Sequence, residues 1–449
     1  MSINNKTIAY MSLGCKVNLY ESVAIVNMFI ENGFTLVDFS EVASIYIINT
    51  CTVTQTSDSK SKKMIRQAAK KNPKAIICVM GCYSQLNPSE ALNIPNVNIV
   101  TGSSNRLDLY NKAMELFNSQ DYDKKIQLTD EYKELNCFEE LSVNCYHDKT
   151  RGFVKIQDGC ENFCSYCTIP FSRGLFRSRD KYSIINEIQT LTNNGMKEIV
   201  LTGINTGAYG KDFSDYNFPK LLTDICESVS NLGRLRISSI EATEVDDNLL
   251  NVMKKYEKHF CMHLHIPLQG GCDEILKKMN RKYDLAFYSK VIDNVRSYFP
   301  LINITADILI GFNGETDELF RKSFAFIESL NYGETHVFPY SPRPKTKAYL
   351  ESKKINFKDQ VDSISKKYRV NELLQLNERN ALKYRKEFLG KEVEVIVEKI
   401  ENGIAFGHSS NYLEVAFNAK SCKDNDLVNV IITEVGYPVL KGVENYVIN

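Results

Sequence analysis

The chain has 449 residues, of which 43% are hydrophobic and 24% charged, and its 55 basic residues balance 55 acidic ones. This length allows roughly three domains, and the composition is that of a folded globular protein rather than a disordered or fibrous one. The net charge of zero gives no global attraction to nucleic acid, so RNA binding would require local basic patches.

The hydrophobic runs and the cysteines predict a cytoplasmic protein with no membrane partner. Residues 1–10 are polar and lack the basic and apolar segments of a signal peptide. No apolar run approaches the roughly 18 residues needed to cross a bilayer. The 13 cysteines are then expected in a reducing compartment, where clustered cysteines more often serve metal binding or catalysis than disulfide bonds.

Residues 7–118 alternate short apolar runs with longer helical stretches. Strands are predicted at 8–13, 44–49, 75–80 and 98–101, and helices at 21–32 and 57–71. This alternation is typical of a parallel α/β sheet, and we assign residues 4–117 to an N-terminal α/β domain. The polar stretch that follows, residues 118–145, is predicted to be a linker.

The middle of the chain repeats the alternation six times. Strands are predicted at 153–157, 198–202, 234–240, 262–267, 303–310 and 334–338. Helical runs separate these strands, so residues 146–376 are predicted to form a partial (β/α) barrel. After a charged helical stretch at 358–388, four or five short strands predict a small all-β barrel, which we assign to residues 379–445.

Three cysteines follow the first strand of the predicted barrel. Cys160, Cys164 and Cys167 have the spacing C-x3-C-x2-C, with the aromatic Tyr166 before the last of them. Three thiolates from one loop can hold three corners of a four-iron cluster and leave one iron open. The alternatives are a structural zinc site or three unrelated buried cysteines. Zinc normally has four protein ligands, usually from two paired knuckles, and no second C-x2-C occurs in the sequence.

This cysteine spacing, Tyr166 and the strand context resemble the radical S-adenosylmethionine superfamily. The resemblance implies that S-adenosylmethionine binds the open iron and that its reductive cleavage yields a radical able to attack unreactive C–H bonds. It also implies that residues at the strand ends contact this cofactor. The residues we select for this role are Tyr166, Gly203, Asn205, Glu241 and Gln269.

Three further cysteines stand at equivalent places in the N-terminal domain. Cys15, Cys51 and Cys82 each follow a predicted strand. Because the carboxyl ends of parallel strands lie along one edge of a sheet, these thiols could converge on one ligand. The alternative is ordinary core packing, which we expect for Cys78 within a strand.

The strings Leu13-Gly14-Cys15, Asn49-Thr50-Cys51 and Gly81-Cys82, ahead of the C-x3-C-x2-C loop, resemble the methylthiotransferase family of radical S-adenosylmethionine enzymes. The resemblance implies that Cys15, Cys51 and Cys82 hold an auxiliary cluster that handles sulfur, so the chain would carry two 4Fe-4S clusters. It further implies that the C-terminal barrel is a TRAM-like RNA-binding domain and that the substrate is tRNA. The electron donor and the sulfur source are not identified by it.

One branch of this family is favoured by the residues around the first cysteines. Lys16-Val17-Asn18 and Thr52-Val53-Thr54 resemble the branch that methylthiolates carbon 2 of N6-threonylcarbamoyladenosine at position 37 of tRNA. The alternatives are N6-isopentenyladenosine in tRNA, an aspartate of a ribosomal protein, and a non-catalytic iron–sulfur or zinc RNA-binding protein. The threonyl substituent carries a carboxylate, which an arginine or lysine should meet. The candidates are Arg173, Arg177, Arg179 and Arg343.

The chain departs from the family pattern at four positions. Asn313 replaces a usual proline, Gly270 and Cys272 stand where serine is common, and Lys345 stands where glycine is usual. None of them is a cluster ligand, but they put cofactor contacts near residues 311–316 in doubt. His263 and His265, at alternate positions of a predicted strand, are expected to face opposite sides and so to make a poor metal pair.

Charge is distributed unevenly between the predicted RNA-binding regions. Residues 57–74 contain seven basic residues and one acid, a net charge of plus six, which predicts either phosphate contacts or a solvated helix face. Residues 388–449 contain five lysines and nine acids, a net charge of minus four. The RNA-binding role of the C-terminal barrel therefore rests on the resemblance.

Overall fold

The computed structural model describes residues 6–146, 150–354 and 359–445, and the chain forms two compact units. The first contains the residues up to Cys145, Gln157–Arg179 and Ser341–Thr346, and the second contains Tyr146–Ile156, Asp180–Tyr340 and the chain from Lys347 onward. Parts of the predicted domains, residues 4–5, 147–149 and 355–358, lie outside the described residues. Every helix in the described ranges is too short or too polar to traverse a lipid bilayer.

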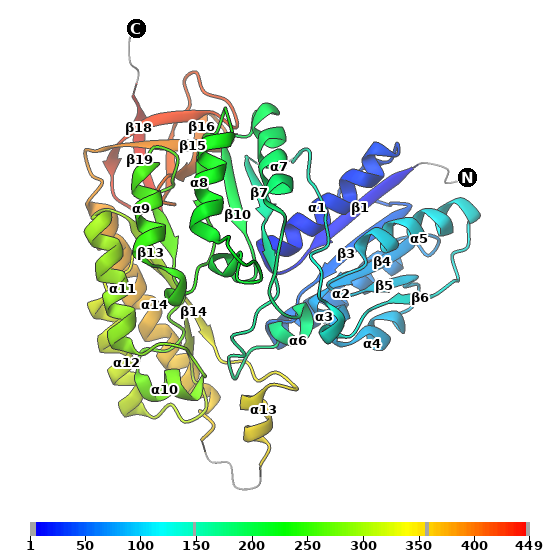
Figure 1. Cartoon of the computed structure of the whole chain (residues 1–449), viewed down its shortest axis with the longest axis horizontal. Coiled ribbons are helices and arrows are strands. Elements are labelled where there is room, and N and C mark those ends of the chain that lie inside the picture. The colour runs from blue at the N-terminus through cyan, green and yellow to red at the C-terminus, as the bar shows by residue number, and fades with distance from the viewer. Residues whose placement is uncertain (1–5, 147–149, 355–358, 446–449) are drawn as a thin grey trace. The chain divides into compact units, whose positions relative to one another are not determined.

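A parallel sheet of six strands forms the centre of the first unit (Figure 1). The strands run in the order β2-β1-β3-β4-β5-β6. Their bounds are β1 Thr7–Ser12, β2 Thr35–Leu36, β3 Ile45–Thr50, β4 Ile76–Gly81, β5 Ile99–Thr101 and β6 Ile126–Leu128. Every residue of β3 and β4 is buried, as expected for strands covered by helices on both faces. The predicted parallel α/β sheet is confirmed.

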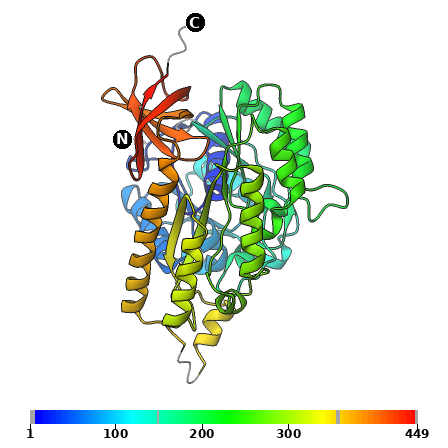
Figure 2. The same ribbon diagram turned by 90° about the vertical axis from the view of Figure 1, so that its left-hand side faces the viewer.

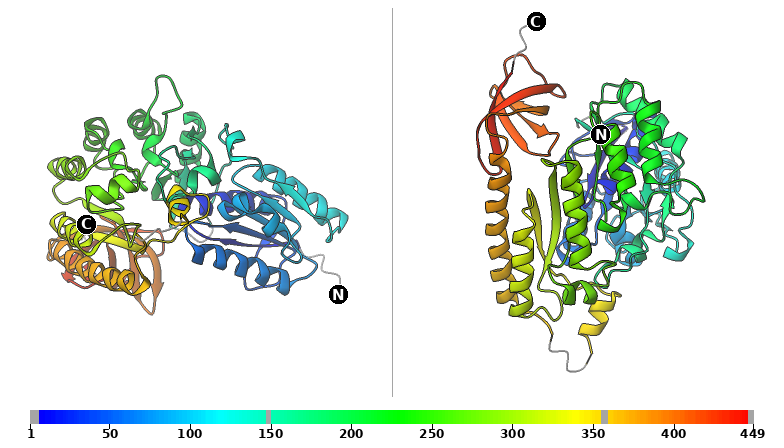
Figure 3. Two further views of the ribbon diagram at one scale, coloured as in Figure 1. Left: turned by 90° about the horizontal axis from the view of Figure 1, so that it is seen from below. Right: turned by 60° about the vertical axis from the view of Figure 1, so that its left-hand side comes forward.

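Helices cover both faces of this sheet (Figure 3, left). They are α1 Lys16–Glu31, α2 Gln55–Lys71, α3 Cys82–Leu86, α4 Pro88–Leu92 and α5 Arg106–Ser119. Helices α1 and α5 contact each other on one face. On the other face α2, α3 and α4 contribute Ile65, Tyr83 and Ala91 to one core with side chains of β3 and β4. The segment predicted as a linker holds β6 and a short 3-10 helix, η1, at Tyr132–Glu134.

Six parallel strands line the open barrel of the second unit. They are β7 Arg151–Lys155, β10 Glu198–Thr202, β11 Arg234–Ile237, β12 His263–His265, β13 Asn303–Ile310 and β14 Glu334–Pro339. β7, β10 and β11 form one sheet and β12, β13 and β14 another, and isolated parallel bridges from Leu235 to Phe260 and from Ser239 to His265 join them. Among the described residues β14 does not pair with β7, so the predicted partial barrel is confirmed.

Most helices of the second unit begin at a side chain that caps them. Their bounds are α7 Lys181–Asn193, α8 Phe218–Ser228, α9 Asp247–Lys255, α10 Asp273–Lys278, α11 Leu285–Tyr298, α12 Asp317–Ser329, α13 Lys347–Ser352 and α14 Ser363–Lys386. Asp180, Asp246 and Thr316 each accept a backbone N–H in the first turn of the next helix, which stabilises the helix start. Helices α12 and α14 run side by side (Figure 2).

A closed barrel of five strands follows α14 (Figure 3, right). Its strands are β15 Glu392–Glu401, β16 Ile404–Ser409, β17 Glu414–Asn418, β18 Leu427–Glu434 and β19 Val439–Glu444. Alternate residues such as Val395, Val415 and Val430 fill its interior, which is the pattern of a small barrel. The predicted all-β module is confirmed.

Candidate active site

The three N-terminal cysteines lie at the carboxyl ends of three neighbouring parallel strands. Cys15 follows β1 as the N-cap of α1, Cys51 directly follows β3, and Cys82 directly follows β4 and begins α3. Because β1, β3 and β4 are adjacent in the sheet, the three residues stand along one edge of it. This is the placement that the sequence predicts, while their shared binding of a cluster stays a prediction.

A glycine permits the close approach of the first two strand ends. Gly14 has a φ of 96°, and a Cβ at this position would lie 2.9 Å from both Cβ and Sγ of Cys51, so any side chain would displace that thiol. Cys51 is buried, and burial together with the nearby Cys82 raises the pKa of the Cys51 thiol. Iron that binds here must therefore displace a proton from the sulfur.

Arg173 is a buried cation beside these cysteines. Its Nε donates to Sγ of Cys82 at 3.3 Å, and its Nη2 donates to Oδ1 of Asn18 at 2.5 Å. The guanidinium also donates to Glu21 through Nη1 at 2.5 Å and Nη2 at 3.1 Å. Although burial opposes its charge, Cys82, Glu21 and Asp158 raise the pKa of Arg173. Arg173 therefore places a fixed cation against Sγ of Cys82, and the deprotonated sulfur is the form of cysteine that binds metal.

The charges around Arg173 form a connected network. Glu21 is fully buried and also binds Arg106, with an Nη2–Oε1 distance of 2.8 Å. Asp158 lies 3.3 Å from Arg173 and 3.5 Å from Arg177. Buried charges are tolerated only when they are paired, so this network fixes the position of Arg173.

The four arginines expected to meet a substrate carboxylate are all buried and all paired within the chain. The pairs are Arg173 with Glu21, Arg177 with Asp158, Arg179 with Glu140, and Arg343 with Asp58. Binding a substrate carboxylate would require each arginine to leave an acid that it already neutralises. A role for any of the four at the substrate carboxylate stays a prediction.

The second group of cysteines lies in one loop of the first unit. Cys160, Cys164 and Cys167 are half-buried and stand between β8 (Gln157–Asp158) and α6 (Ile169–Arg173). Cys167 N–H donates to the Cys164 carbonyl at 3.0 Å and so tightens the loop. The N–H of Ile169 donates to Sγ of Cys167 at 3.4 Å. Such N–H bonds to sulfur help to set the potential of iron–sulfur clusters.

In the part of the chain that the structure describes, neither cysteine group has the three closely spaced sulfurs of a single-ion site, since neither brings its three sulfurs within 4.8 Å of one another. A single zinc ion requires such proximity, whereas a four-iron cluster binds each thiolate at a different corner. Gly159 has a φ of 76°, and a Cβ there would lie 1.7 Å from the Leu175 carbonyl oxygen, so a side chain at this position would distort the cysteine loop.

Four of the five residues expected to contact S-adenosylmethionine lie just past barrel strands. Gly203 and Asn205 follow β10, Glu241 follows β11, and Gln269 follows β12. The carboxyl ends of such strands carry the active sites of (β/α) barrels, and this mixture of carboxylate, amides and glycine backbone suits a polar nucleoside. Arg281 neutralises Glu241, with its Nη1 3.2 Å from Oε1. The fifth residue, Tyr166, belongs to the cysteine loop of the first unit.

The departures from the family pattern have local explanations. Asn313 is buried and donates to a backbone carbonyl of α13 at 2.9 Å. In the same loop, Oε1 of Glu315 accepts the Gly311 N–H at 3.0 Å and pairs with Arg369 at 2.7 Å, so the loop is held without the usual proline. Lys345 has a φ of 71°, a left-handed conformation that glycine adopts without cost.

His263 and His265 lie on the same face of β12, and the expectation that they face opposite sides is wrong. Nε2 of His263 and Nδ1 of His265 lie 3.0 and 2.9 Å from the same atom, Oγ1 of Thr305. Side chains two residues apart along a strand point to one side. The two histidines therefore share one environment.

Five of the seven basic residues between positions 57 and 74 are exposed. They are Lys60, Lys63, Arg66, Lys70 and Lys74. Their spacing of three or four residues places the first four along one face of α2. Lys62 instead pairs with Glu90. The exposed cations form a row suited to phosphates.

Comparison with known proteins identifies the family. Residues 7–102 match the family described as "Uncharacterized protein family UPF0004", and residues 154–327 match the radical SAM superfamily. The chain is 40% identical to the threonylcarbamoyladenosine tRNA methylthiotransferase MtaB of Bacillus subtilis (strain 168), over 97% of this chain and 96% of that protein. The chain belongs to the tRNA methylthiotransferase family of radical S-adenosylmethionine enzymes. Membership of the radical SAM superfamily implies S-adenosylmethionine and a 4Fe-4S cluster.

Two further comparisons concern the substrate branch within the family and the fold of the chain. The tRNA-2-methylthio-N(6)-dimethylallyladenosine synthase of Thermoanaerobacter sp. (strain X514) is 34% identical, over 96% of this chain and 90% of that protein. The solved structure of the radical S-adenosylmethionine methyltransferase TsrM from Kitasatospora setae, with cobalamin and a 4Fe-4S cluster bound, aligns with a TM-score of 0.54 and 13% identity. That alignment covers 77% of each chain and supports the fold alone.

The sequence reasoning missed the partners of Arg173. Asn18 and Glu21 lie three and six residues after Cys15 on α1, a spacing that keeps them near one side of the helix. Both are polar residues in a largely buried helix, which is itself a signal of a buried partner. Read together, these features could have identified the network.

Proposed function

We propose that the chain methylthiolates carbon 2 of N6-threonylcarbamoyladenosine at position 37 of tRNA. The observation that carries this proposal is the 40% identity to the Bacillus subtilis enzyme of that name, over 97% of the chain. The dimethylallyladenosine synthase reaches 34%. The residues that suggested the branch, Lys16–Asn18 and Thr52–Thr54, border Cys15 and Cys51.

The two cysteine groups divide the chemistry in this proposal. Cys160, Cys164 and Cys167 hold the radical cluster, and Cys15, Cys51 and Cys82 hold the auxiliary cluster. When bound, these groups and S-adenosylmethionine would supply radical activation of an unreactive C–H bond and a place to hold sulfur. The chain's own part is to donate hydrogen bonds to sulfur, from Arg173 to Cys82 and from the Ile169 N–H to Cys167. An electron donor and a sulfur source from outside the chain complete the reaction.

This function leads to proposals for the domain limits, the RNA-binding surfaces and the cellular location. We propose the domain limits 4–117, 118–145, 146–376 and 379–445, with the last domain binding RNA. The exposed cations of α2 bind tRNA phosphates. The tRNA substrate supports a cytoplasmic location.

The test is expression of the chain in a bacterial host that lacks its own tRNA methylthiotransferases, followed by mass spectrometry of the tRNA nucleosides. We expect 2-methylthio-N6-threonylcarbamoyladenosine with the wild type and none with Cys167→Ala. Cys226→Ala, which changes a cysteine outside both groups, should leave the product in place. If only the methylthiolated isopentenyladenosine appears, the chain belongs to the other branch.

A further inference from the structure

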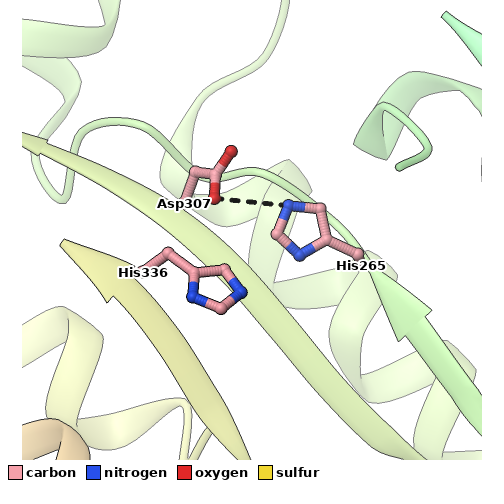
Figure 4. A group of neighbouring side chains, drawn as sticks. All are labelled: His265, Asp307 and His336. Carbon is pink, nitrogen blue, oxygen red and sulfur yellow. Dashed lines mark ion pairs between the residues drawn. The ribbon is translucent and has the colours of Figure 1, made fainter. Parts of the chain in front are cut away.

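A third group of metal-binding side chains lies on strands β12, β13 and β14. It shares no residue with the two cysteine groups. In the strand register His265 lies opposite Thr305, and Asp307 lies opposite His336. Because alternate residues of a strand share a face, all of these side chains project from one side of the sheet. Figure 4 shows His265, Asp307 and His336 turned toward one another.

The distances suit a single small ion. One ligand atom from each residue lies within 4.8 Å of the other two, and Nε2 of His265 lies 3.5 Å from Oδ1 of Asp307. A tetrahedral zinc ion, with bonds of about 2.0–2.1 Å, holds its ligand atoms about 3.3 Å apart. His265 and Asp307 are half-buried and His336 is exposed, so the His336 ring can turn toward an ion that the other two residues hold.

A hydrogen bond to Thr305 orients His265. Oγ1 of Thr305 lies 2.9 Å from Nδ1 of His265 and 3.0 Å from Nε2 of His263. The hydroxyl carries one proton, so it donates to one ring and accepts from the other. When Nδ1–H of His265 donates to Thr305, Nε2 keeps its lone pair on the side of Asp307. Metal-binding histidines typically have their second nitrogen held in this way.

Charge favours a cation over an anion at this place. Two neutral imidazoles and one carboxylate carry a net charge of minus one, which attracts a divalent cation and repels phosphate or carboxylate groups. The competing interpretation is an ion pair between protonated His265 and Asp307. That pair involves two of the three residues and does not account for the His336 ring, whose centroid lies 5.8 Å from that of His265.

We propose that His265, Asp307 and His336 bind one divalent transition-metal ion. Two imidazoles and one carboxylate are a ligand set that zinc accepts. Three protein ligands leave at least one position on the ion open for water or for a nitrogen or oxygen atom of a ligand.

The test uses the full chain, reconstituted with iron and sulfide without oxygen, equilibrated with zinc and then desalted. We expect elemental analysis to find about one zinc per chain in addition to the iron. His265→Ala, Asp307→Asn and His336→Ala should each weaken zinc binding about tenfold or more in competition with a chelator, with unchanged iron. His259→Ala, which removes a histidine outside the group, should retain the zinc.

Two further variants test whether the zinc is bound by the cysteines and not by the two histidines and Asp307. Replacing Cys15, Cys51 and Cys82 by alanine, or Cys160, Cys164 and Cys167, should leave the zinc in place. Asp307→Asn conserves the shape of the side chain, so its loss of zinc does not depend on a folding defect. The proposal is overturned if zinc is lost from the cysteine variants but retained by His265→Ala, Asp307→Asn and His336→Ala. It is also overturned if the wild-type chain retains no zinc.

Discussion

At the scale of single residues, Arg173 connects the two parts of the first unit that carry cysteines. It lies in α6, directly after the loop of Cys160–Cys167, and donates to Sγ of Cys82 at 3.3 Å. Glu21 and Asn18 of α1 hold the other side of its guanidinium. Since Cys15 is the N-cap of α1, one arginine ties the position of two cysteines of the first group to the loop that carries the second.

Replacing Arg173 by methionine should strongly destabilise the first unit. The variant leaves buried Glu21 with Arg106 as its remaining cation, and a broken buried pair typically costs about 3–5 kcal/mol of unfolding free energy. Urea unfolding measures this loss. The double variant Arg173→Met with Glu21→Gln should recover part of it, since less unpaired charge remains. If the losses of unfolding free energy in the single variants Arg173→Met and Glu21→Gln add up to the loss in the double variant, the two residues do not act as a pair.

The cysteines of the site could be predicted from the sequence, whereas the roles of the arginines could not. Each cysteine follows an apolar run or belongs to a tight loop, and both features are visible as local patterns. The pairing of Arg177, Arg179 and Arg343 depends on which acids the fold buries next to them, and no local pattern records this. The error at His263 and His265 was one of geometry, because strand residues two apart share a face.

At the scale of elements, buried ion pairs connect the open barrel to the closed C-terminal barrel within the second unit. Glu198, at the start of β10, pairs with Arg234 at 2.7 Å and with Arg236 at 2.6 Å. Both arginines also donate to backbone carbonyls in or next to β16, at His408 and Ser410. Glu198 therefore fixes two of the arginines through which the two barrels contact each other.

Acid should loosen this contact. Although burial opposes ionisation, Arg236 and Arg234 lower the pKa of Glu198 to about 2, against about 4.3 for a free glutamate. Because folding lowers this pKa, its contribution to stability is complete above about pH 4.5 and is lost as the pH falls toward 2. The difference corresponds to about 3 kcal/mol.

Glu198→Gln tests this pH dependence. The variant should be less stable than the wild type at pH 7, and its unfolding free energy should fall less between pH 5 and pH 2. Glu257→Gln, at an exposed position, serves as the control. Equal slopes of unfolding free energy against pH in the wild type and Glu198→Gln would exclude a special role for this carboxylate.

Helix α2 provides the second element-scale prediction. If its exposed cations bind tRNA, Lys63→Ala with Arg66→Ala should weaken binding and reduce the salt dependence. Each phosphate contact that is lost removes somewhat less than one unit from the slope of log K against log salt, so the slope should fall by about 1.5. Filter binding of tRNA at several salt concentrations gives this slope. A wild-type slope in the variant, or an equal decrease in the control Lys254→Ala with Lys255→Ala, would remove α2 from the interface.

At the scale of the whole molecule, the sequence predicted three architectures that the structure contains. The parallel sheet, the partial barrel and the closed barrel each have a strong periodic pattern. The assignment of the C-x3-C-x2-C loop to the same compact unit as the N-terminal sheet was not predicted. This grouping arises from long-range contacts, such as Arg173 with Glu21, between residues about 150 positions apart in the sequence.

The central claim is that two groups of three cysteines perform different parts of one reaction. Its most direct test measures 5′-deoxyadenosine and methylthiolated nucleoside together, in the wild type and in two triple alanine variants. Loss of Cys160, Cys164 and Cys167 should abolish both products. Loss of Cys15, Cys51 and Cys82 should abolish the methylthiolated nucleoside while 5′-deoxyadenosine still forms. If this second variant keeps its remaining iron and its fold but forms no 5′-deoxyadenosine, the separation of roles is contradicted.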